Sequence, residues 1–197
     1  MKLLHLDSSI MGEGSASRAI SKAVVERFRA ENADIDVTYR DLAADPLPHM
    51  TLEIYQQLAD GEAVKQFLES DVIVIGAGFY NFSIPSQLKS WIDRIAVPGK
   101  TFAYREGGPV SLVPGKKVVI ALARGNTYGA ESPRASFEHA ETLLRSVFAF
   151  LGAEIDVVVA EGLGRGEEAR RNAVDAAIDR AGRLHAGIAP PAALAPL

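Results

Sequence analysis

The chain contains 197 residues, of which 48% are hydrophobic and 23% are charged, and its formal net charge is −4. This composition predicts one globular domain over residues 1–197, and it lacks the basic surface that binding to nucleic acid or to an anionic membrane requires. The absence of cysteine excludes disulfides, thiolate metal sites and a thiol nucleophile.

The first apolar run, residues 2–6, predicts a buried strand, and Asp7 ends it too early for the core of a signal peptide. Strand-like and helix-like patterns then alternate along the chain. The expected strands are residues 2–6, 36–40, 71–76, 117–123 and 155–160. The expected helices are residues 17–32 with Ser17 as N-cap, 52–70 with a break at Gly61, 85–96, 134–151 and 167–186. No apolar run is long enough to span a bilayer, so we expect a cytoplasmic protein without membrane contact.

Three other segments have a distinctive composition. Residues 98–115 are rich in glycine and proline and predict a surface excursion, which we interpret as a hairpin over the active face. Residues 190–197 are rich in proline and alanine and predict a frayed tail. The last helix carries both signs of charge, and we expect a solvated face on which acidic and basic side chains pair: Glu167, Glu168, Asp175 and Asp179 with Arg170, Arg171, Arg180 and Arg183.

The alternation of strands and helices predicts a parallel sheet covered on both faces, because each parallel connection needs a crossover helix. Five such strands suit an α/β fold of the flavodoxin-like, doubly wound type, with strand order 2-1-3-4-5. Ligands of such sheets bind beyond the carboxyl ends of the strands, near the point where the strand order reverses. The loops at residues 7–17, 77–84 and 124–133 are therefore the candidate site.

The first of these loops has the chemistry of a phosphate site. It contains the hydroxyl groups of Ser8, Ser9, Ser15 and Ser17, and it leads into a helix N-terminus, where free amide groups favour an anion. Neither the G-x-G-x-x-G fingerprint nor a P-loop is present, which favours a monophosphate such as that of FMN over a pyrophosphate or ATP. A flexible loop with one capping serine is the alternative.

The second loop combines three aromatic residues with an amide. Phe79, Tyr80 and Phe82 flank Asn81 directly after the central strand. Aromatic rings at a strand end can pack on a flat heterocycle, and Asn81 offers both hydrogen-bond donors and acceptors. The alternative is that these rings only cover the end of the sheet.

The run from Phe79 to Lys89, followed by Trp91-Ile92-Asp93-Arg94, resembles the FMN-dependent NADH azoreductases, which are flavodoxin-like quinone reductases. Further matches follow in chain order: Ser8-Ser9 with Ser15-x-Ser17, Tyr39-Arg40-Asp41-Leu42, Gly99-Lys100-Thr101-Phe102-Ala103-Tyr104, Gly115-Lys116-Lys117 and Ala160-Glu161-Gly162. The ordered set covers nearly the whole chain.

The resemblance implies which residues bind FMN. The FMN phosphate would be held by Ser9, Ser15, Ala16 and Ser17. The isoalloxazine would be lined by Phe79, Tyr80, Asn81 and Phe82, and closed on its other side by Ala123, Arg124, Gly125 and Asn126. The chain departs from the family pattern at Ala16 (usually Gln), Gly78-Phe79 (usually Pro-Met), Ala123 (often Ser) and Asn126 (often Gly). Backbone contacts survive these changes, whereas side-chain contacts from Ala16 and Ala123 do not.

The implied activity is a ping-pong transfer of hydride from NADH or NADPH, by way of non-covalent FMN, to a quinone or an azo compound. The flavin carries this chemistry, so we name no catalytic side chain. Arg124 is expected either to steady negative charge on the reduced flavin or to lie on the surface. The family also implies a homodimer with the site at the interface.

Three other functions occur on folds of this kind. A flavodoxin-type electron carrier would also bind FMN. An SGNH-like serine esterase would use Asp7-Ser8, but the only late histidine, His185, has Gly182 where its acidic partner should stand. A receiver-type signalling domain needs an acid where Gly76 stands. We expect no metal site, because no set of histidines and carboxylates has ligand spacing.

Overall fold

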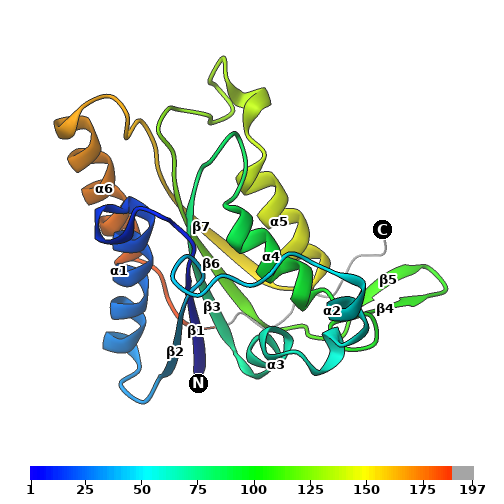
Figure 1. Ribbon diagram of the computed structural model, residues 1–197. Helices are drawn as coiled ribbons and strands as arrows, with labels where there is room; N and C mark the ends of the chain where they lie inside the picture. Colours follow the sequence, from blue (N-terminus) through cyan, green and yellow to red (C-terminus); the bar gives the residue numbers. More distant parts are fainter. Residues whose placement is uncertain (188–197) are drawn as a thin grey trace.

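A parallel five-stranded sheet forms the centre of the computed structural model, which describes residues 1–187 (Figure 1). The predicted tail, residues 190–197, lies outside the described residues. The strand order is β2-β1-β3-β6-β7, and the strands are β1 (Lys2–Asp7), β2 (Asp36–Asp41), β3 (Val72–Gly78), β6 (Lys117–Ala123) and β7 (Glu154–Ala160). Because β4 and β5 belong to a separate hairpin, this is the predicted 2-1-3-4-5 order of the sheet strands.

Helices cover both faces of the sheet. The first face carries α1 (Ala16–Glu31) and α6 (Glu167–Ala181). The opposite face carries α3 (Glu62–Glu69), α4 (Ser86–Ile95) and α5 (Ala140–Phe150), with the short α2 (Leu52–Gln56) at its edge (Figure 1). Side chains alternate between the two cores, so that Leu4 and Leu6 pack on the α4 side while Leu3 packs beneath α1.

Several helix boundaries differ from the prediction. The helix α1 begins at Ala16, because Ser15 and not Ser17 is its N-cap and accepts the Arg18 amide. The helix α5 begins at Ala140 rather than at residue 134, because the Glu138 carboxylate accepts the first free amides of the helix. The helix α6 ends at Ala181. The expected break at Gly61 is present, between a 3₁₀ turn and α3.

The excursion at residues 98–115 contains the antiparallel hairpin of β4 (Phe102–Arg105) and β5 (Gly108–Ser111). The hairpin packs at the end of α5, where the Phe102 and Phe150 rings are 4.8 Å apart and the Ser111 hydroxyl donates to the Leu151 carbonyl. In Figure 1 it projects beside α2, away from the β1–α1 loop. The hairpin is therefore confirmed, but its predicted place over the active face is wrong for this chain.

Candidate functional site

A cleft of about 260 Å³ opens at the carboxyl edge of the sheet, where the loops after β1, β3, β6 and β7 meet. Most of the predicted site residues line it: Ser9, Ser15, Ala16, Ser17, Phe79, Tyr80, Ala123 and Gly125. The predicted residues Asn81, Phe82, Arg124 and Asn126 are not part of this lining. The cleft also includes residues that the sequence reasoning did not select: Met11, Gly14, Gly78, Leu163, Gly164 and Arg170.

Two buried serines stand at the N-terminus of α1. The hydroxyl oxygens of Ser15 and Ser17 are 3.0 Å apart, and Ser15 also accepts the Arg18 amide at 3.4 Å. The next amides, of Ala16 and Ser17, belong to the first helical turn and have no acceptor within the helix. Hydroxyl and amide donors at the positive end of a helix form a donor set that suits a phosphate.

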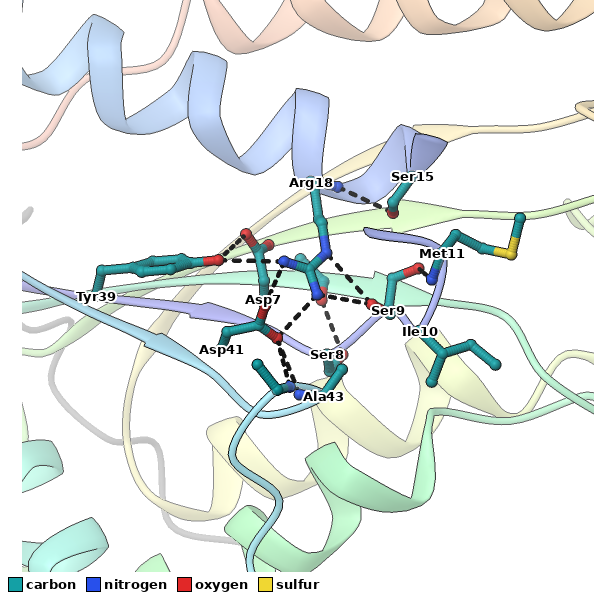
Figure 2. A network of polar contacts seen from close by, with 12 residues as sticks. Asp7, Ser8, Ser9, Ile10, Met11, Ser15, Arg18, Tyr39, Asp41 and Ala43 are labelled. Carbon is teal, nitrogen blue, oxygen red and sulfur yellow. Dashed lines mark hydrogen bonds and ion pairs between the residues drawn. The ribbon is translucent and has the colours of Figure 1, made fainter. Parts of the chain in front are cut away.

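The backbone of Ser9 is fixed by Arg18, as Figure 2 shows. The guanidinium donates to the Ser9 carbonyl from Nε (3.3 Å) and Nη2 (2.8 Å). Its other N–H groups reach the Asp41 carboxylate at 2.6 and 2.8 Å and the Tyr39 hydroxyl at 3.2 Å. These five bonds use all five donors of the arginine. Arg18 therefore ties the loop after β1 to the edge strand β2.

Arg18 and Asp41 each stabilise the charged form of the other. The hydrogen bond from Arg18 holds the pKa of Asp41 below its usual range, and the bond to Asp41 raises the pKa of the Arg18 guanidinium. Burial and the negative charge of Asp7 raise the pKa of Tyr39. The phenol therefore stays protonated and donates to Asp7 at 3.3 Å.

The Asp7 carboxylate is buried at the end of β1, where it also accepts a hydrogen bond from Ser21 at 2.8 Å. The space for it depends on Gly76, since a Cβ at that position would lie 2.1 Å from an Asp7 oxygen. His5 bonds to Ser21 at 3.0 Å. The neighbouring Ser8 is fully buried and donates to the Gly76 carbonyl at 2.8 Å. Ser8 thus lacks the exposure and the basic partner that a nucleophile requires, which argues against the esterase.

The loop after β3 turns back at Asn81 and Phe82. Tyr80 and Ser83 exchange two backbone hydrogen bonds, at 2.9 and 3.0 Å, across these two residues. Asn81 has a φ of 47° and Phe82 a φ of 71°, as in the type I′ turn. Such a conformation is costly for a large aromatic residue, by about 1–3 kcal/mol, and strain of this kind is concentrated at functional sites.

This turn places Tyr80 against the first loop. Its hydroxyl lies 3.1 Å from the Ser9 hydroxyl and accepts the Ile10 amide at 3.3 Å. A Cβ at Gly78 would lie 3.0 Å from the Tyr80 ring. A side chain at this position, where the chain departs from the family pattern, would therefore press on the Tyr80 ring and shift it by a few tenths of an ångström.

Arg124 does not face the cleft. Its side chain is 3% exposed and forms ion pairs with Glu138, Glu141 and Glu161 at 3.2, 2.8 and 2.7 Å. The prediction that Arg124 lies on the surface is therefore wrong. Its guanidinium binds three carboxylates and does not line the cleft. Its Cζ lies 5.9 Å from the Phe79 ring centroid. Arg124 thus supports the aromatic lining from behind.

Glu161 and Glu138 hold the loop that follows β6 in place through hydrogen bonds and ion pairs. Glu161 accepts the Tyr128 amide at 3.0 Å as well as Arg124. Burial tends to raise the pKa of Glu138, but the amides of the first turn of α5 and the charge of Arg124 keep that pKa below its usual range. The Tyr128 ring packs on Phe79 with centroids 4.6 Å apart.

Arg170 reaches the cleft from the first turns of α6 and donates to the Gly14 carbonyl. Arg180, on the same helix, donates to the Val159 carbonyl. The prediction that these arginines pair with acids of their own helix is wrong for both. Since α6 packs against both α1 and β7, these two arginines meet backbone carbonyls of neighbouring segments instead.

A family model described as the flavodoxin-like fold matches residues 1–184. The chain belongs to this flavodoxin-like family. Its relatives include the FMN-dependent NADH:quinone oxidoreductase of Gluconacetobacter diazotrophicus, which is 50% identical over 192 residues that cover 90% of this chain and 96% of the relative. The protein of the same name from Bradyrhizobium sp. is 49% identical over 201 residues, covering 94% of this chain and 100% of the relative.

Solved structures show the same family likeness. The crystal structure of azoreductase from Bacillus anthracis str. Sterne has a TM-score of 0.81 and 27% identity, over 93% of this chain and 100% of that chain. The FMN-dependent NADH-azoreductase from B. anthracis str. Ames Ancestor, solved in complex with FMN, has a TM-score of 0.80 and 24% identity over 92% of this chain and 98% of its own. The second likeness shows the flavodoxin-like fold alone.

Residues 1–187 also bear on membrane-spanning and metal-binding features. In this part of the chain, no helix has the length and apolar character needed to cross a membrane. The same residues contain no group of three or more histidine, cysteine or acidic side chains placed to hold a metal ion.

Proposed function

We propose that the protein is an FMN-dependent NADH oxidoreductase that reduces quinones and cleaves aromatic azo compounds. The observation that carries this proposal is that one cleft combines a serine-lined helix N-terminus with the aromatic side chains of Phe79 and Tyr80. A phosphate suits the first and a flat ring system suits the second. The names of the relatives, which are about 50% identical over most of the chain, support the same activity.

The residues of the cleft fit FMN. Ser9, Ser15 and Ser17 offer hydroxyl groups to the phosphate, together with the first amides of α1. Phe79 and Tyr80 supply an aromatic lining in the same cleft. Three residues of the lining have no polar side-chain atom and can contact FMN only through the backbone: Ala16, Ala123 and Gly125.

Bound FMN would supply two-electron transfer, accepting hydride from a reduced nicotinamide and passing the electrons on. The chain's own residues would bind the cofactor and orient it. Donor and acceptor would use one cleft in turn, so we expect parallel reciprocal plots in steady-state kinetics. A quinone needs one such cycle and an azo bond needs two.

Four further properties belong to this proposal. NADPH is an alternative donor to NADH. The chain acts as a homodimer with the cleft at the interface, in the cytoplasm. Residues 1–197 form one domain. The resemblance to the azoreductases supports the dimer.

The test is an anaerobic visible spectrum of the purified protein after addition of FMN. We expect a protein-bound flavin spectrum that bleaches on addition of NADH and returns on addition of a quinone. A bound flavin that NADH does not reduce would favour the electron carrier. A protein that binds no FMN would refute the proposal.

A further inference from the structure

Two arginines approach the loop of residues 8–17, and they differ in how many N–H donors and how much positive charge remain free to bind a ligand. Arg18 follows directly after the serines in sequence, but all five of its donors are used by Ser9, Tyr39 and Asp41. Its positive charge is also compensated by the Asp41 carboxylate. Arg18 is absent from the lining of the cleft.

Arg170 has the opposite properties. It lines the cleft together with Ser15, Ala16 and Ser17. Within residues 1–187 its side chain has one hydrogen bond, to the neutral carbonyl of Gly14, and no ion pair. A guanidinium with one neutral acceptor has four N–H donors and a full charge available.

The phosphate of FMN carries a charge of about −1.5 to −2 at neutral pH. The serine hydroxyls and helix amides around the cleft are neutral donors, so they leave most of this charge uncompensated. An arginine on the rim supplies charge-assisted hydrogen bonds, which are about twice as strong as neutral ones.

We propose that Arg170 is the cationic partner of the FMN phosphate and that it makes the cleft prefer FMN to riboflavin. The inference rests on the proposed function and deepens it, because it assigns the phosphate selectivity to α6 rather than to the serine loop alone. Arg18 is then a positioning residue that holds the Ser9 backbone.

The test compares the dissociation constants of FMN and riboflavin, measured by quenching of flavin fluorescence at two salt concentrations. The variants are Arg170→Gln, Arg170→Lys and, as a matched control, Arg171→Gln, which removes the same charge from the exposed neighbouring position. We expect Arg170→Gln to weaken FMN binding about tenfold and to leave riboflavin binding within about twofold. Arg170→Lys should retain most of the FMN affinity, and Arg171→Gln should match the wild type.

The outcomes separate this inference from the proposed function. Equal weakening of FMN and riboflavin by Arg170→Gln would mean that Arg170 only tethers Gly14, and would overturn the inference. Unchanged FMN affinity would overturn it too, since the phosphate would then lie elsewhere. Both results leave the proposed function intact, because that function fails if the wild-type protein binds no FMN or if NADH does not reduce the bound flavin. A steeper loss of FMN affinity with salt in the wild type than in Arg170→Gln would support the inference.

Discussion

The ion pair between Arg18 and Asp41 gives a prediction whose size follows from its geometry. The two side chains are 17% and 22% exposed and share bonds of 2.6 and 2.8 Å. Asp41 also accepts the amides of Ala43 and Ala44 at 2.9 and 3.2 Å. Hydrogen bonds to charged groups contribute about 1.5–3 kcal/mol, and breaking a fully buried pair costs about 3–5 kcal/mol. For this partly exposed pair we expect Asp41→Asn to lower the free energy of unfolding by about 2 kcal/mol.

The assay is urea denaturation followed by circular dichroism. The control is Asp93→Asn, which breaks the exposed i,i+4 pair with Lys89, whose side chains are 48% and 38% exposed. That pair should contribute only about 0.3–0.5 kcal/mol. A double-mutant cycle with Arg18→Gln then isolates the coupling between Arg18 and Asp41.

The pH dependence of this difference has a definite sign. Arg18 lowers the pKa of Asp41 in the folded protein, so the pair stabilises the fold above the unfolded-state pKa of about 3.9. This stabilisation is lost as the pH falls through the lower, folded-state pKa. The gap between wild type and Asp41→Asn should thus stay constant from about pH 7 to 5 and shrink below about pH 4. A variant within about 0.5 kcal/mol of the wild type at pH 7, or a gap that widens in acid, would refute the reasoning.

Three further substitutions test other parts of the site. Gly76→Ala places a methyl group 2.1 Å from an Asp7 oxygen and should lower the free energy of unfolding, measured by urea denaturation, by about 3 kcal/mol. The control is Gly129→Ala, which has nothing within 4 Å and should change this free energy by less than about 0.5 kcal/mol. Ser17→Asp adds a negative charge at the helix N-terminus and should weaken FMN binding at least about tenfold in a fluorescence titration; unchanged affinity would place the phosphate elsewhere. Glu161→Gln should cost about 1–2 kcal/mol, because it weakens two hydrogen bonds in the loop after β6, and an unchanged urea midpoint would contradict this.

The sheet was predictable because most of its strands are short apolar runs joined by helical segments. A parallel pair needs a crossover helix, so the alternation indicated a parallel sheet, and five such strands suited the flavodoxin-like order. The start of α5 was not predictable in the same way. Residues 134–139 have helical composition, yet Glu138 caps the helix through its side chain and keeps the preceding residues outside it. Side-chain capping of this kind has no signal in hydrophobic periodicity.

The contacts of Arg124 and Arg170 could not be predicted from the sequence either. Arg124 lies in a polar loop, and its three carboxylate partners come from positions 138, 141 and 161, which only the folded chain brings together. Arg170 lies on a charged helix whose pattern suggests a solvated surface. Its approach to Gly14 depends on the packing of α6 against α1, which the charge pattern of α6 does not encode.

Contacts along the carboxyl edge link the loop after β1 to the loop after β3. Arg18 holds the Ser9 backbone, and the Ser9 hydroxyl lies 3.1 Å from that of Tyr80. Tyr80 keeps this position because Gly78 leaves room for its ring and because the strained turn at Phe82 reverses the chain behind it. Asp41, Arg18, Ser9 and Tyr80 thus form one continuous series of hydrogen bonds. The departure from the family pattern at Gly78 is thus part of how this chain joins its phosphate loop to its aromatic turn.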